Sequence, residues 1–210
     1  MLKLSASDVL IVVDVQNDFL PGGSLAVPSG DEIISVINHI APSFENVVLT
    51  QDWHPSGHMS FASTYQDHQV GQVMQTPYGM QMLWPNHCVQ GTFGAQIATG
   101  LGIAHVQLII RKGFHQHIDS YSAFVEADRQ THTGLAGYLK ERNIKHCYIC
   151  GLATDFCVAW TAQDARASGF EATVVEDACR GIDIDGSLDR AWQDMQISGV
   201  KRTSVKDMYI

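Results

Sequence analysis

Residues 9–19, VLIVVDVQNDF, carry the pattern that decides the fold class. Residues 9–13 form a continuous apolar run, and Asp14 follows it directly. Such a run, ending at a polar residue, is typical of a strand buried on both faces in a parallel sheet. Similar runs lie at residues 47–50, 106–110 and 147–150, with a weaker one at 172–175. The sequence therefore predicts several buried parallel strands.

Helical patterns separate these runs, at about residues 31–43, 132–142 and 155–168, and another follows the last run at 188–198. Strands that alternate with helices predict right-handed crossovers and a parallel sheet between helical layers. We expect one α/β domain over residues 1–210, a three-layer sandwich whose mainly parallel central sheet is flanked by helices.

Residues 51–94 interrupt this alternation, because they are rich in Pro, Gly, His, Trp and Gln and show little periodicity. Long segments without a pattern inside a compact domain are usually functional or disordered. The aromatic residues spread through this segment argue against disorder. We therefore expect an ordered insertion that covers a site.

The composition narrows the function classes. The chain has 210 residues, with 13 Lys and Arg against 22 Asp and Glu, and a formal charge of −9. This balance excludes the clustered basic surface that nucleic-acid binding requires, and no apolar run approaches the roughly 18 residues that span a bilayer. The first residues lack a signal-peptide pattern, and the five cysteines are an odd number without the spacing of secreted domains. We expect reduced thiols and a cytoplasmic location.

Reactive side chains follow the predicted strands. Asp14 ends the first strand, Lys112 follows the third, and Cys157 lies just after the fourth. Ligands of an open α/β sheet bind at the carboxyl ends of its strands, so these groups are expected to meet. With Thr154 or Asp155 as the N-cap, Cys157 would lie in a first helical turn, where thiol pKa values are depressed. The pattern favours a thiolate nucleophile with Asp14 as its base; a buried structural cysteine beside a structural ion pair is the alternative.

A second group of side chains suits a metal. In the extended segment Asp52-Trp53-His54, the carboxylate and the imidazole point to one side. His87 and His58 are candidates to complete the set. Imidazole with carboxylate suits zinc, iron or manganese. Solvated loop histidines are the alternative interpretation.

Taken in order, these residues resemble one known family. The segments that carry the resemblance are VDVQNDF at 13–19, PGGSL at 21–25, QDWHP at 51–55, WPNHC at 84–88, KG at 112–113 and GLATDFCV at 151–158. Together they are similar to the nicotinamidase/pyrazinamidase family of isochorismatase-like hydrolases, and the likeness runs from about residue 9 to residue 181.

The resemblance implies the isochorismatase-like hydrolase fold and an activity. Members of this family hydrolyse nicotinamide to nicotinate and ammonia, and pyrazinamide to pyrazinoate, through a cysteine thioester, as part of pyridine nucleotide salvage. By resemblance Asp14, Lys112 and Cys157 form the catalytic triad. The same resemblance implies one divalent metal ion, with ligands Asp52, His54 and His87 and with His58 as a weaker candidate.

The resemblance also implies how a small flat substrate is held. Phe19, Trp84 and Tyr121 would line the slot for its ring, and the backbone N–H groups of Ala153 and Cys157 would hold the oxyanion. A cis peptide bond between residues 152 and 153 would aim the first of these N–H groups.

Other functions stay open at this point. Another cysteine hydrolase of the superfamily could act on a ureido or carbamoyl amide, although a metal that binds a ring nitrogen belongs with a nicotinamide-type substrate. An isochorismate-cleaving enzyme would give Cys157 no clear purpose. A noncatalytic metal-binding protein, with Cys157 as core, belongs to a different class. The sequence leaves both a monomer and a homo-oligomer open.

Overall fold

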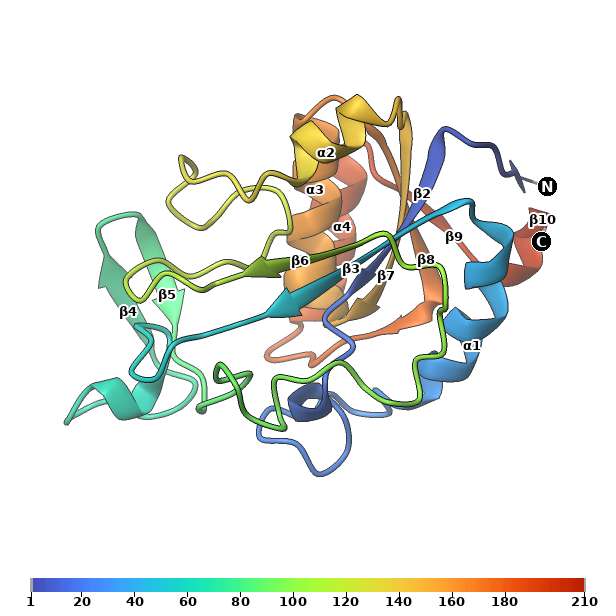
Figure 1. Cartoon of the computed structure of the whole chain (residues 1–210). Coiled ribbons are helices and arrows are strands. Elements are labelled where there is room, and N and C mark those ends of the chain that lie inside the picture. The colour runs from blue at the N-terminus through green and yellow to red at the C-terminus, as the bar shows by residue number, and fades with distance from the viewer. Residues whose placement is uncertain (1, 210) are drawn as a thin grey trace.

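The computed structural model describes residues 2–209 and contains a central sheet of six parallel strands in the order β6-β3-β2-β7-β8-β9 (Figure 1). The strands are β2 (Asp8–Val13), β3 (Asn46–Asp52), β6 (Leu108–Lys112), β7 (His146–Leu152), β8 (Glu171–Arg180) and β9 (Lys201–Thr203). Two short strands, β1 (Leu2–Lys3) and β10 (Met208–Tyr209), pair near the chain ends.

Helices cover both faces of this sheet. They are α1 (Glu32–Ile40), α2 (Leu135–Glu141), α3 (Ala159–Ala167) and α4 (Ser187–Ile197). Figure 1 shows α1 on one face and α2, α3 and α4 on the other. This is the arrangement that right-handed crossovers produce, because the chain moves one way across the sheet after β2 and the other way after β6. The expected α/β sandwich is confirmed.

The burial of each strand follows from its place in the sheet. All six residues of β2 are buried, since β3 and β7 flank it and helices cover both faces. The strand β6 lies at the edge, and its side chains alternate between partly buried and exposed until the buried Lys112. Continuous apolar runs therefore mark the central strands, whereas the edge strand is less apolar.

The predicted boundaries differ from the structure where polar residues take part in the sheet. The third run was predicted at 106–110, but β6 is Leu108–Lys112, because its polar end pairs with the end of β3. The strand β9 was not predicted, since its three residues, Lys-Arg-Thr, are polar. The helix predicted from about 132 begins at Leu135, after Gly134 with a left-handed φ of +97°.

The segment 51–94 contains more regular structure than its sequence suggests. It includes the antiparallel hairpin of β4 (Val73–Thr76) and β5 (Gly79–Met82), which lies beyond the carboxyl ends of β3 and β6 (Figure 1). Isolated bridges, His54 with Val89 and Phe61 with Trp84, connect its distant parts. The segment is thereby folded against the edge of the sheet where the reactive residues are expected.

Within residues 2–209, no helix has both the length and the apolar character needed to cross a bilayer.

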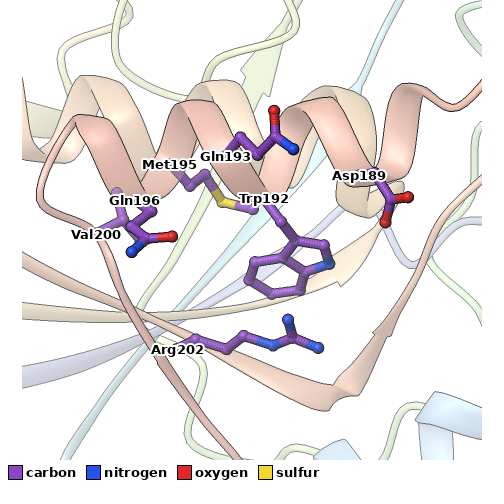
Figure 2. Close-up of a pocket in the computed structure, with 7 residues that line it drawn as sticks. All are labelled: Asp189, Trp192, Gln193, Met195, Gln196, Val200 and Arg202. Atoms are coloured by element: carbon purple, nitrogen blue, oxygen red, sulfur yellow. The ribbon is translucent and has the colours of Figure 1, made fainter.

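A cavity of about 430 Å³ lies away from that edge, between α4 and β9, where the guanidinium of Arg202 is 4.2 Å from the centre of the Trp192 ring (Figure 2). This cavity shares no residue with the predicted site.

Candidate active site

Lys112 is the centre of the reactive group. Its Nζ lies 2.8 Å from Asp14 Oδ2 and 2.5 Å from Asp52 Oδ1, and it donates hydrogen bonds to Ser120 O at 3.0 Å and to Cys157 Sγ at 3.4 Å. The ends of β2, β3 and β6 and the turn after β7 supply these groups, so the structure brings the predicted triad together. The two carboxylates outweigh burial and raise the pKa of Lys112 well above its usual value, which keeps it charged.

Asp14 is fully buried and has one carboxylate oxygen without a hydrogen bond. Thr50 donates to Oδ1 at 2.5 Å and accepts the Asp14 backbone N–H at 3.0 Å. Oδ2 faces Lys112 as an ion pair but accepts no hydrogen bond of good angle within residues 2–209. Burial, aided by the charge of Asp52, outweighs Lys112 and raises the pKa of Asp14. This oxygen, Oδ2, is therefore placed to accept a proton.

Cys157 lies in a short π-helical turn, Thr154–Val158, that precedes α3. The predicted side-chain cap was wrong: Ala153 is the N-cap, and no side chain caps the turn. The expectation of a depressed thiol pKa was also wrong. Burial raises the pKa of Cys157 well above its usual value, and the opposing charge of Lys112 does not cancel this. The thiol is therefore protonated at rest and needs a base, and the Asp14 carboxylate, which lies within 4.8 Å of the sulfur, is placed to be that base.

The backbone around this turn supports the predicted oxyanion site. The peptide bond between Leu152 and Ala153 is cis, as the resemblance implies. Within residues 2–209, the Ala153 N–H has no hydrogen-bond acceptor, whereas the Ala153 carbonyl accepts from the N–H groups of Phe156 and Val158. Free N–H groups at the start of a helical turn are suited to hold an oxyanion.

Asp52, His54 and His87 form the predicted metal group, with one ligand atom from each within 4.8 Å of the others. Asp52 Oδ2 lies 3.3 Å from His54 Nε2 and 3.7 Å from His87 Nε2. Gly113 makes room for this arrangement, because a Cβ at this position would lie 2.5 Å from the His54 ring. All three side chains are buried, so the ligand atoms converge in a small enclosed space.

The hydrogen bonds of the two imidazoles fit a metal ion. His54 Nδ1 donates to Gly113 O and His87 Nδ1 donates to Pro85 O, each at 2.8 Å. These bonds leave the Nε2 lone pairs directed at the Asp52 carboxylate; metal-binding histidines typically donate their other ring N–H in this way. Burial lowers the pKa of His54, but the Asp52 charge outweighs it and raises the pKa, so this space favours a positive charge.

His58 lies beside this group. Its ring centre is 4.2 Å from that of His54. Its Nδ1 is 2.7 Å from Ser60 Oγ and its Nε2 is 3.2 Å from Ile118 O. Burial and the neighbouring His54 lower the pKa of His58 to about 4, so it is neutral. It belongs to an adjoining group with His54 and Asp119 that could also hold a cation, and a role as fourth ligand stays a prediction.

A narrow cavity beside Cys157 contains all three residues predicted to hold the substrate ring. Phe19, Trp84 and Tyr121 line it together with the thiol, and the Trp84 Nε1 donates to the Tyr121 hydroxyl at 2.9 Å. The structure adds lining residues that the sequence did not reveal: Leu25, Phe156 and Ile182. The first two lie within segments that carried the resemblance, but an apolar side chain next to a motif gives no signal of which way it points.

Gln16 is a positioning residue that sequence reasoning missed. Its Oε1 accepts the Asp52 backbone N–H at 2.8 Å, and its Nε2 donates to Asp52 O and to Ala95 O, each at 2.9 Å. The fully buried side chain thus hydrogen-bonds both the N–H and the carbonyl of Asp52 and connects them to Ala95, just after the insertion. The signal in the sequence that could have indicated this role was its position, two residues after Asp14.

Asp155 acts in a similar way at the turn that carries Cys157. Its carboxylate accepts the backbone N–H groups of Ile182 and Asp183, at 3.0 and 2.8 Å, and the Ser187 hydroxyl at 2.5 Å. These bonds fasten the loop that carries Ile182 to the turn that carries Cys157. The residue predicted as a cap therefore connects two segments that line the cavity, one with Cys157 and one with Ile182.

Comparisons with known proteins agree with this arrangement. The isochorismatase domain family matches residues 8–207. The chain is 56% identical over 209 residues to the nicotinamidase of Acinetobacter baylyi, covering 100% of this chain and 98% of that protein. A solved structure of a nicotinamidase/pyrazinamidase from Acinetobacter baumanii has a TM-score of 0.97 and 57% identity, covering 99% of this chain and 100% of that chain. A pyrazinamidase of Pyrococcus horikoshii in complex with zinc has a TM-score of 0.78 and 36% identity, covering 94% of this chain and 99% of that chain. The chain therefore belongs to the isochorismatase family.

Proposed function

We propose that this chain is a nicotinamidase, which hydrolyses nicotinamide to nicotinate and ammonia in pyridine nucleotide salvage and also accepts pyrazinamide. The observation that carries the proposal is the contact of Lys112 with Asp14 and Cys157 at the wall of an aromatic cavity. High identity to a nicotinamidase over the whole chain supports the same substrate. Segment 51–94 acts as the metal- and substrate-binding insertion of a single domain.

In the acylation step, Asp14 accepts the proton of the Cys157 thiol, and the sulfur attacks the carboxamide carbon. The oxygen of the tetrahedral intermediate accepts hydrogen bonds from the N–H groups of Ala153 and Cys157. The C–N bond then breaks, and the departing amine takes the proton from Asp14 and leaves as ammonia. Lys112 stays charged beside both groups, where it stabilises the thiolate and the ionised carboxylate.

In the deacylation step, a water molecule attacks the thioester carbon and gives one proton to Asp14. The C–S bond breaks, Asp14 returns its proton to the sulfur, and the carboxylic acid that is released ionises to nicotinate by giving its proton to the solvent. The proton thus moves between the same two side chains in both halves of the reaction. The raised pKa values of Asp14 and Cys157 suit this exchange, because each group holds a proton readily.

Asp52, His54 and His87 would hold one divalent ion, zinc, iron or manganese, which when bound supplies a Lewis acid beside the cavity. The structure with zinc of the Pyrococcus horikoshii relative supports this assignment. Phe19, Trp84 and Tyr121 would hold the flat ring of the substrate between them.

Ammonia release from nicotinamide by the purified, metal-loaded protein tests the proposal. Cys157→Ala should abolish release while the fold and the metal content stay intact. Cys150→Ala is the matched control, because Cys150 is also buried but its sulfur faces the backbone carbonyl of Ile11 in β2, at 3.9 Å. Undiminished release in Cys157→Ala would overturn the mechanism. Release from ureido or carbamoyl amides but not from nicotinamide would overturn the substrate and keep the thiol site.

A further inference from the structure

A second cavity lies behind the proposed substrate slot. It has a volume of about 180 Å³, and Tyr78, Val125 and Trp160 contribute to its walls. Among the described residues that line the two cavities, Tyr121 is the one they have in common. The ring of Tyr121 therefore separates the slot beside Cys157 from the space behind it.

Neighbouring aromatic side chains fix Tyr121 in this place. Its ring centre lies 5.6 Å from that of Phe156, which lines the slot, and 6.0 Å from that of Trp160, which lines the second cavity. Phe156 and Trp160 are four residues apart along the helical turn and α3, a spacing that places them on one face. The hydrogen bond from Trp84 Nε1 to the Tyr121 hydroxyl adds a third contact.

The second cavity suits an uncharged hydrocarbon group. Arg129 is the one cation in its wall, and both of its terminal nitrogens bind the Asp164 carboxylate, at 2.9 and 2.5 Å. The arginine charge is thus already compensated and offers little attraction to an anion. An apolar cavity of about 150 Å³ in another protein binds benzene, so this space is large enough for one further aromatic ring.

We propose that Tyr121 sets the upper size limit of the substrate: its ring closes the slot after one aromatic ring and keeps fused-ring carboxamides out of the second cavity. The inference rests on the proposed function and adds the specificity of that site. Without the phenol ring, the two cavities would join into one pocket that accepts a bicyclic aromatic amide.

Two bicyclic amides test this inference, quinoline-3-carboxamide and isoquinoline-4-carboxamide, which carry the second ring on different edges of the pyridine. The measured quantity is kcat/KM for the better of the two, divided by kcat/KM for nicotinamide. Tyr121→Ala and Tyr121→Leu should raise this ratio by about tenfold or more, the scale at which pocket size discriminates substrates. Tyr121→Phe should leave the ratio unchanged, because the ring stays and only the hydrogen bond to Trp84 is lost.

A double variant locates the second ring. Ala127 lines the second cavity, so Ala127→Trp added to Tyr121→Ala should fill the cavity and reverse the gain. Three results would overturn the inference. The ratio could be unchanged in Tyr121→Ala and Tyr121→Leu, Tyr121→Phe could show a gain of the same size, or the gain could survive Ala127→Trp. Wild-type protein that hydrolyses either bicyclic amide as well as nicotinamide would overturn it without any variant.

A binding measurement separates this inference from the proposed function. Should wild-type protein hydrolyse none of these amides, the proposed function fails. The size limit is then measured by calorimetry with nicotinate and quinoline-3-carboxylate as probes. Tighter relative binding of the bicyclic acid in Tyr121→Ala supports the size limit in that case, and equal relative binding contradicts it.

Discussion

Asp52 connects the two groups of reactive side chains. Its Oδ1 meets Lys112, and its Oδ2 faces His54 and His87. Burial raises the pKa of Asp52, but Lys112 and His54 outweigh it and hold the pKa well below its usual range, so the carboxylate is ionised. Asp52 and Asp14, two buried carboxylates, then share the single ammonium group of Lys112. Buried charges are stable only when compensated, so the cluster is suited to a further cation at the imidazole end.

The raised pKa of Cys157 predicts how its alkylation depends on pH. Because burial favours the protonated thiol, the thiolate fraction should increase about tenfold for each pH unit up to at least the ordinary range of thiols near pH 8.5. The rate of iodoacetamide labelling, followed by mass spectrometry of the peptide that contains Cys157, should increase in the same way. A rate that levels off below pH 7 would show a depressed pKa instead. Cys157→Ala, in which the four other buried cysteines remain, gives the background labelling.

At the level of strands and helices, apolar runs predicted the centre of the sheet well. The strands β2 and β7 are buried on both faces, so the sequence had to be continuously apolar there. The strands β6 and β9 lie at the edges, where polar residues can pair without being buried, and apolar pattern alone misplaced the first and missed the second. The short length of β9 also made it hard to predict, since three residues are too few to show a period.

The hairpin of β4 and β5 was missed for a different reason. Its register pairs Thr76 with Gly79 around Pro77 and Tyr78, and a Pro-x-Gly turn between alternating residues is a hairpin signal. The surrounding Gln and Met residues masked the alternation.

The candidate site was easier to predict than the elements that support it. Chemistry at the end of a strand is visible in a sequence, because an acid, a lysine or a thiol is out of place next to an apolar run. Gln16 and Asp155 act through backbone groups of distant residues, and these contacts have no pattern along the chain. The pKa of Cys157 was mispredicted because the sequence shows a helix start but not the depth of burial.

The hydrogen bonds of Gln16 to the Asp52 backbone predict that removal of the Gln16 side chain lowers the metal affinity. Gln16→Ala would leave the Asp52 N–H and carbonyl buried without partners, so the free energy of unfolding should fall by about 2–4 kcal/mol. The metal affinity should fall about 10–100-fold, as for other groups that orient a ligand. Competition with a chromophoric chelator measures the affinity, and urea unfolding measures the stability.

Gln51→Ala is the matched control for this prediction. Gln51 donates to the same Ala95 carbonyl at 2.9 Å, and its Oε1 accepts from Arg111, but its side chain makes no hydrogen bond to Asp52 within the described residues. This variant should lose stability and keep its metal affinity. An equal loss of affinity in both variants would mean that Gln16 acts only through general stability.

On the scale of the whole molecule, the metal group joins parts of the chain that lie far apart in the sequence. His54 pairs with Val89 across an isolated bridge, His87 lies in the last part of the insertion, and Gly113 follows β6. A ligand that binds only the folded state increases stability by mass action, about 2.7 kcal/mol at one hundred times its Kd. The bound ion should therefore stabilise the insertion and, through it, the edge of the sheet.

Removal of the metal should lower the melting temperature. For a domain of about 150–250 residues, each kcal/mol shifts Tm by about 2–4 °C, so dialysis against EDTA should lower Tm by about 5–10 °C. Differential scanning calorimetry, with elemental analysis of the same samples, measures both quantities. His54→Ala should contain no metal, and EDTA should leave its Tm unchanged, whereas His39→Ala, an exposed residue of α1, should show the wild-type shift. A ligand bound at this group must stabilise the folded state by mass action. Two results would therefore show that the group does not couple a metal to folding: a wild-type Tm that EDTA leaves unchanged, or a shift that persists in His54→Ala.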